Sequence, residues 1–233
     1  MTRRLVVNAD DLGLTAGVND GIVEAHVRGI VTSASLMVRQ PAAADAACLA
    51  RAHPRLGVGL HLDLGEWAYR DGGWVALYTV VDVDDEAAVT AEVGRQVECF
   101  QDLVGRSPTH LDSHQHVHDD DPVRSVVADT ARGLGVPVRG RAHRYVGSFY
   151  GQLGTGEAYP EGITVEALVE LLRSLPDGDA ELGCHPARTD GLAATGTMYV
   201  TERLVELRAL CDTAVRDTVA AEGIELVTFG GLR

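Results

Sequence analysis

Short apolar runs alternate along the chain with segments that repeat apolar side chains at helical spacing. Seven runs have the length of buried strands, and they cover residues 4–9, 33–38, 56–62, 109–114, 136–140, 180–186 and 224–229. The spacing between them predicts helices over residues 15–28, 42–52, 89–104, 121–133, around 168–172, and 201–221. This alternation is typical of a parallel sheet, and seven strands favour closure into a barrel over an open sheet.

The chain has 233 residues, of which 45% are hydrophobic, enough for a sizeable core. No internal repeat, linker or low-complexity segment interrupts the pattern, so a single domain over residues 1–233 is expected. No apolar run is long enough to cross a membrane, and the apolar run near the N-terminus is too short for a signal peptide. We therefore expect a cytoplasmic protein without a membrane partner.

The net charge of −14 disfavours binding to nucleic acid or to an anionic membrane, because either partner needs a basic surface. A neutral or cationic small molecule is the more natural partner. The four cysteines are widely spaced and form no C-x-x-C pair, so buried thiols explain them better than disulfides or a zinc knuckle.

Polar side chains gather where the predicted strands end. Asp10 and Asp11 end the first strand, and His61, His114 and His185 end the third, fourth and sixth. Each has an ordinary explanation alone: a helix cap or turn for an aspartate, a hydrogen-bonded strand residue for a histidine. Barrels and doubly wound sheets, however, build their sites at the carboxyl ends of strands. The agreement of four strand ends favours one shared site.

The adjacent carboxylates Asp10 and Asp11 raise a geometric question. Neighbouring side chains of an extended strand point to opposite faces, so the strand must stop here if both carboxylates share one site. A carboxylate and two imidazoles form a suitable ligand set for one divalent metal. Three protein ligands leave positions open for water, which is typical of catalytic sites.

The segment 110–121, "HLDSHQHVHDDD", is the richest in candidate ligands, with four of the nine histidines. If it stays extended, one face carries His110, Asp112, His114, His116 and His118. These are more side chains than one metal takes, and periodicity does not choose among them. A solvated polar loop is the alternative, which the concentration of histidines argues against.

At these residues the sequence resembles the YdjC/ChbG family of carbohydrate deacetylases. The resemblance runs in order through "VNADDLGLTAGVNDGIVEAHVRGIVTSASLMV", "VGLHLDL", "PTHLDSHQHVH", "SFYG" and "ELGCHPA". It implies an α/β fold, a distorted and incomplete (β/α) barrel related to the polysaccharide deacetylase fold. It also implies metal-dependent removal of acetyl from a small N-acetylated amino sugar.

The resemblance assigns roles to the strand-end residues. It makes Asp10 the catalytic base and Asp11 a metal ligand. His61 and His114 complete the ligand set for one divalent metal ion, Zn²⁺ or Mg²⁺, and the two imidazoles favour zinc. His185 falls where the family has a histidine facing the reaction centre. Its ordinary pKa near 6.5 suits a proton donor to the leaving amine.

Other residues have less specific assignments. Asp112 is expected to orient an imidazole, and His116 or His118 would replace His114 if that residue were not the ligand. Tyr150, and Arg139 or Arg141, are expected to line the sugar pocket or to steady a carboxylate.

The chain also departs from the family pattern. Leu12 stands where members often have Phe, and Gln115 stands where some have a further His. The segment 64–85 is shorter than in chitooligosaccharide-specific members. These departures leave the sugar specificity open. Trp67 and Trp74 in this segment are as compatible with stacking on a sugar ring as with ordinary packing.

Two other functions compete with carbohydrate deacetylation. A metallo-phosphoesterase needs two metals and a basic phosphate clamp, and the scarcity of arginine and lysine around the motifs speaks against it. A non-catalytic metal- or sugar-binding protein needs neither Asp10 as base nor His185 as acid.

The resemblance further implies a homodimer, which sedimentation at the mass of a single chain would contradict.

Overall fold

The structure is a computed structural model that describes residues 2–141 and 143–232. Its strands are β1 (Arg3–Leu12), β2 (Ser33–Leu36), β3 (Gly57–Leu62), β4 (Gly65–Arg70), β5 (Gly73–Thr79), β6 (Leu111–Ser113), β7 (Arg144–Val146), β8 (Gly178–Cys184) and β9 (Ile224–Leu226). Its α-helices are α1 (Ala16–Arg28), α2 (Ala43–Ala52), α3 (Glu86–Val104), α4 (Val123–Leu134), α5 (Val165–Ser174), α6 (Thr201–Leu210) and α7 (Thr213–Ala221).

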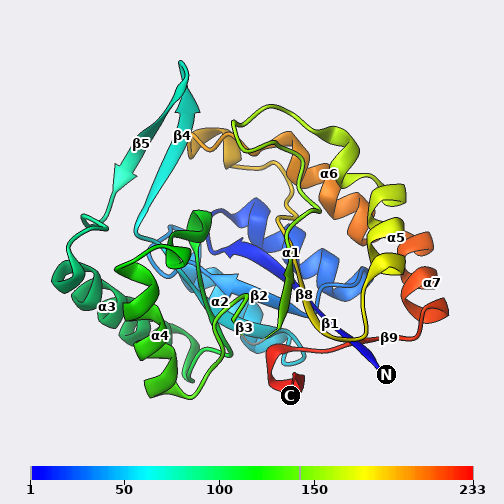
Figure 1. Cartoon of the computed structure of the whole chain (residues 1–233), viewed down its shortest axis with the longest axis horizontal. Coiled ribbons are helices and arrows are strands. Elements are labelled where there is room, and N and C mark those ends of the chain that lie inside the picture. The colour runs from blue at the N-terminus through cyan, green and yellow to red at the C-terminus, as the bar shows by residue number, and fades with distance from the viewer. Residues whose placement is uncertain (1, 142, 233) are drawn as a thin grey trace.

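Seven strands form one parallel sheet in the order β6-β3-β2-β1-β8-β7, with β9 beside the first residues of β1. The sheet is curled and helices cover its outer side, α3 and α4 at one end and α5 to α7 at the other (Figure 1). Among the described strands, the outermost members β6 and β7 do not pair with each other. The predicted incomplete barrel is therefore confirmed.

The central strand β1 separates an apolar layer from a polar one. Leu5, Val7 and Ala9 belong to the hydrophobic core, whereas Asn8 and Asp10 alternate with them and are equally buried. Because side chains alternate between the two faces of a strand, the polar ones lie on the opposite, inner face of the curled sheet. The fold therefore delivers polar groups to its concave side.

Three predicted elements differ from the structure. Residues 136–140 form only an isolated bridge, between Val138 and Leu111, because the chain turns there with Gly140 at φ +68°; the next strand is β7, which pairs with β8. The predicted helix over 201–221 is two helices, since the Asp212 carboxylate caps a new helix by accepting the N–H of Ala214. Helix α4 begins one residue late, with Pro122 rather than Asp121 at the capping position.

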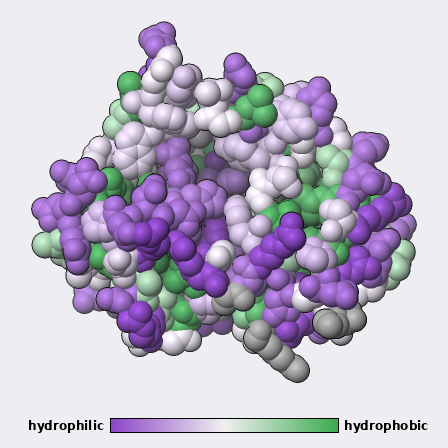
Figure 2. Space-filling model, viewed as in Figure 1, coloured by the Kyte–Doolittle hydropathy of each residue, from purple (hydrophilic) through white to green (hydrophobic). Residues whose placement is uncertain are grey.

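The segment after β3 forms an antiparallel hairpin, β4–β5, that stands away from the main sheet (Figure 1). On the face drawn in Figure 2, the surface is hollowed below this hairpin. No helix in residues 2–141 and 143–232 combines the length and apolarity needed to span a bilayer.

Candidate active site

The two adjacent aspartates reach one site through a distortion of β1. The strand continues to Leu12, but its pairing with β2 slips between Ala9 and Leu12, and Asp11 adopts φ +66°. A left-handed residue inside a strand is uncommon outside glycine, and bulges of this kind re-aim side chains next to active sites. The prediction that the strand stops was wrong, because a bulge turns both carboxylates the same way.

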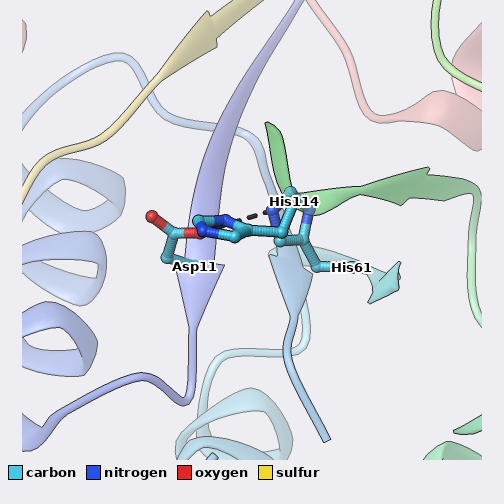
Figure 3. Close-up of side chains that lie close together, drawn as sticks. All are labelled: Asp11, His61 and His114. Carbon is cyan, nitrogen blue, oxygen red and sulfur yellow. Dashed lines mark hydrogen bonds and ion pairs between the residues drawn. The ribbon is translucent and has the colours of Figure 1, made fainter. Parts of the chain in front are cut away.

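Asp11, His61 and His114 meet at the carboxyl ends of β1, β3 and β6 (Figure 3). The Asp11 Oδ1 atom lies 3.3 Å from His61 Nε2 and 3.1 Å from His114 Nδ1. One potential ligand atom from each residue lies within 4.8 Å of the other two. All three side chains are largely buried, so the cluster forms the floor of a recess and not a surface patch.

These residues fit one divalent metal ion. Neighbouring ligands that each lie about 2.1 Å from a metal are about 3.0–3.4 Å apart, and the two distances around Asp11 fall in this range. The nitrogen of His114 that faces Asp11 is Nδ1, and the buried Nε2 atom has no hydrogen-bond partner in the described part of the chain, so no hydrogen bond at Nε2 opposes ligation through Nδ1. The donor set of one carboxylate and two imidazoles is typical of zinc.

Asp112 orients His61. Its Oδ1 atom lies 2.8 Å from His61 Nδ1, which leaves Nε2 directed at Asp11. Burial lowers the pKa of His61, but the carboxylates of Asp112 and Asp11 outweigh it and raise the pKa to about 10. A metal ion that bound His61 would therefore displace a proton.

Arg139 binds Asp10, the other carboxylate of the adjacent pair. Its guanidinium donates to both oxygens of Asp10, at 2.6 and 2.7 Å, and also contacts Asp112 at 2.9 Å and Glu181 at 2.6 Å. Burial raises the pKa of Asp10, but the charge of Arg139 outweighs it and leaves the pKa below its ordinary value. Arg139 was predicted to line the sugar pocket or to steady a carboxylate, and in the structure it contacts carboxylates. Arg141 instead pairs with the exposed Asp119.

Arg203, a residue of α6, performs a similar task for Asp11. Its Nη2 atom donates to Asp11 Oδ2 at 2.6 Å, which leaves Oδ1 facing the two histidines. Burial acts to raise the pKa of Asp11, yet Arg203 and His114 hold it well below the ordinary value. No sequence pattern singled out Arg203, because it lies inside a helical segment far from every motif. The site thus contains two arginines that the sequence motifs did not include as a cluster. Arg139 and Arg203 are both paired with aspartates.

His185 follows β8 and faces Asp10, with Nε2 lying 3.7 Å from Asp10 Oδ2. Its backbone N–H donates to the buried carboxyl of Glu206, and Tyr199 donates to the same group. Burial lowers the pKa of His185 to about 4 and raises that of Glu206 to about 8. The pKa of His185 therefore lies below the ordinary value near 6.5 on which its prediction as a proton donor was based.

His116 and His118 do not join the Asp11 cluster. The chain is extended only to Ser113, and a 3₁₀ turn over His114–Asp119 follows, with left-handed φ angles at Gln115 and His116. His116 contacts the Tyr145 hydroxyl, and His118 Nδ1 lies 2.7 Å from Ser113 Oγ. The expected single face of histidines was therefore wrong. The two rings and Asp119 form a separate group.

A cavity of about 470 Å³ opens above Asp10, Asp11 and the histidines. Its walls are rich in aromatic side chains, as is usual for small-molecule pockets, and include Trp67, Trp74, Tyr145, Tyr150 and Tyr199. Tyr150 stacks on Tyr199 with ring centres 4.4 Å apart and meets His185 edge-on at 5.3 Å. The chemistry-bearing floor is thus covered by surfaces suited to a ring-shaped ligand.

Comparison with known proteins agrees with this arrangement. A sequence profile described as YdjC-like protein matches residues 4–221. The chain belongs to the YdjC-like family. A carbohydrate deacetylase of Geobacillus stearothermophilus is 36% identical over 98% of both chains. A chitooligosaccharide deacetylase of Klebsiella pneumoniae strain 342 is also 36% identical, over 98% of this chain and 99% of the relative.

Solved structures show which fold this chain shares. A protein of Enterococcus faecalis V583 described as a cellobiose-phosphate cleavage protein superposes with a TM-score of 0.82, at 25% identity over 99% of this chain and 98% of the other. A polysaccharide deacetylase of Bacillus cereus gives a TM-score of 0.56 at 10% identity, over 97% and 92% of the two chains. The YdjC-like chain therefore has the polysaccharide deacetylase fold.

Proposed function

We propose that this YdjC-like protein is a metal-dependent carbohydrate N-deacetylase acting on a small N-acetylated amino sugar, a mono- or disaccharide. One observation carries the proposal: Asp11, His61 and His114 meet beside a second carboxylate, Asp10, at the floor of an aromatic pocket. The names of the relatives, carbohydrate and chitooligosaccharide deacetylase, support the substrate class.

Asp10 is the base in this proposal. Asp11, His61 and His114 would hold the divalent metal, Zn²⁺ or Mg²⁺, which when bound polarises the acetamide carbonyl and lowers the pKa of water. Asp10 accepts a proton from the attacking water. Its two oxygens are fixed by Arg139, so the carboxylate is oriented before the substrate arrives.

His185 completes the proton path. When the bond between the acetyl carbon and nitrogen breaks, the amine nitrogen must receive a proton. The Nε2 atom of His185 lies beside Asp10, so the proton taken from water can pass through the imidazole to the amine. A neutral ring suits this relay, because it first accepts a proton and then donates it.

The proposal is tested by a screen of acetylated mono- and disaccharides with free amine and acetate as readouts. We expect release of both in equal amounts from at least one N-acetylated amino sugar. Sugar phosphates, tested in parallel, are expected to release no phosphate. Phosphate release without acetate release would favour a metallo-phosphoesterase, and tight sugar binding without any product would favour a binding protein.

A further inference from the structure

Glu66 is a buried carboxylate that the proposed mechanism does not use. It lines the same cavity as Asp11, His114 and Arg203, and it is 5% exposed. In the part of the chain that the structure describes, no ion pair joins it to an arginine or a histidine, although Asp10 and Asp11 each pair with a buried arginine. The hydroxyl-bearing side chain of Thr197 supplies a neutral hydrogen bond.

The β4–β5 hairpin is built to direct this side chain into the pocket. Gly65, the residue before it, has φ +152°, and a Cβ there would lie 2.9 Å from the Tyr78 carbonyl oxygen. The pairing of β4 with β5 slips between Glu66 and Trp67, and a bulge of this kind re-aims the side chains beside it. The glycine conformation and the bulge lie on either side of Glu66, so both affect the direction of its side chain.

Gln115 fixes the bend in place. Its amide donates to the Trp67 carbonyl at 2.8 Å and accepts the Trp67 N–H at 2.9 Å, as a neighbouring strand would. Gln115 directly follows the proposed ligand His114 and has a left-handed φ of +51°. The hairpin residue next to Glu66 is therefore tied to the turn that carries one of the proposed metal ligands.

His114 and Arg203 act on Glu66 electrostatically without forming an ion pair with it, and a buried carboxylate is costly unless donors satisfy its oxygens. Thr197 offers one donor, and Glu66 lines the cavity with capacity to accept further hydrogen bonds, so a ligand rich in hydroxyl groups is the partner that this position fits. With the acetamide group at the Asp11 cluster, the 3-hydroxyl is the nearest ring donor of a linked sugar, because the other neighbour of the acetamido carbon, C1, carries the glycosidic oxygen. We propose that Glu66 binds this hydroxyl, which makes it a specificity-determining residue. The inference rests on the proposed deacetylase function.

The test uses N,N′-diacetylchitobiose and its analogue that lacks the 3-hydroxyl on both rings. Acetate release by the metal-loaded wild type is expected to have a kcat/KM about 10- to 100-fold lower for the analogue, the range for a hydrogen bond to a charged group. Glu66→Gln is expected to lose a similar factor on the parent sugar and little on the analogue. Its metal content should equal that of the wild type, because Glu66 is not a ligand in this account.

Glu225→Gln is the matched control, since Glu225 is exposed on β9 beside the first residues of β1, at the opposite end of the sheet. An equal loss by Glu66→Gln on both sugars, or a fall in its metal content, would overturn the inference. The wild type tests it without any mutation, because equal turnover of both sugars would also overturn it. If neither sugar is turned over, the deacetylase proposal fails separately. The Kd values of the two sugars then test the role of Glu66: the wild type should bind the analogue about 10- to 100-fold more weakly than the parent sugar, and equal Kd values would overturn the inference.

Discussion

Replacing Asp10 with asparagine is expected to lower acetate release by about 10²–10⁴-fold, the usual contribution of a general base. Asparagine keeps the size of the side chain but accepts no proton from water at neutral pH. Metal content should stay at the wild-type level, because Arg139 binds both oxygens of Asp10 and Asp10 is not one of the three proposed ligands. The measurement is kcat for acetate release together with metal per chain.

Asp20→Asn, the same change at an exposed position of α1, controls for nonspecific effects. Excess metal should not restore the activity of Asp10→Asn. If added metal did restore it, Asp10 would be a ligand, and the assignment of base and ligand within the pair would be reversed.

Replacing Arg139 with methionine is expected to destabilise the fold by about 3–5 kcal/mol. Arg139 is 1% exposed and contacts Asp10, Asp112 and Glu181, so its loss removes the one guanidinium that these three buried carboxylates share. Breaking a buried ion pair from one side is costly because the remaining charge is desolvated without compensation. The measurement is the free energy of unfolding from urea denaturation at neutral pH.

Arg141→Met provides the matched control two residues along the chain. The side chains of Arg141 and its partner Asp119 are 44% and 58% exposed, and exposed pairs contribute about 0–1 kcal/mol. A loss in Arg139→Met no larger than in Arg141→Met would contradict the role of Arg139 as the centre of a buried network.

Much of the fold could be predicted from local periodicity. The apolar runs around β1, β3 and β8 are buried on both faces and lie close to their predicted ranges. Periodicity failed where a single contact decides the outcome. The helix predicted over 201–221 breaks because the Asp212 side chain caps a second helix, and the strand predicted over 136–140 gives way to a turn that carries Arg139 into the interior.

The candidate site was predictable where its residues end strands. Strand ends pointed to Asp10, Asp11, His61, His114 and His185, because parallel strands bring their carboxyl ends together. The choice of Asp11, His61 and His114 as ligands came from the family resemblance, and the structure brings these three side chains together. Arg203 and Glu66 were not found, since one lies within a helix and the other in a hairpin whose position depends on Gln115. The bulge at Asp11 was also missed, because a left-handed aspartate is stabilised by its tertiary contacts and leaves no pattern in the sequence.

The most direct test of the account is metal removal and return, with acetate release from N,N′-diacetylchitobiose measured at each stage. We expect stripped wild-type protein to release no acetate, and about one Zn²⁺ or Mg²⁺ per chain to restore the activity. His114→Ala should bind metal poorly and need excess metal for any activity, whereas His118→Ala should bind it as the wild type does. Full activity in the stripped protein, or full metal binding by His114→Ala, would contradict the proposed site.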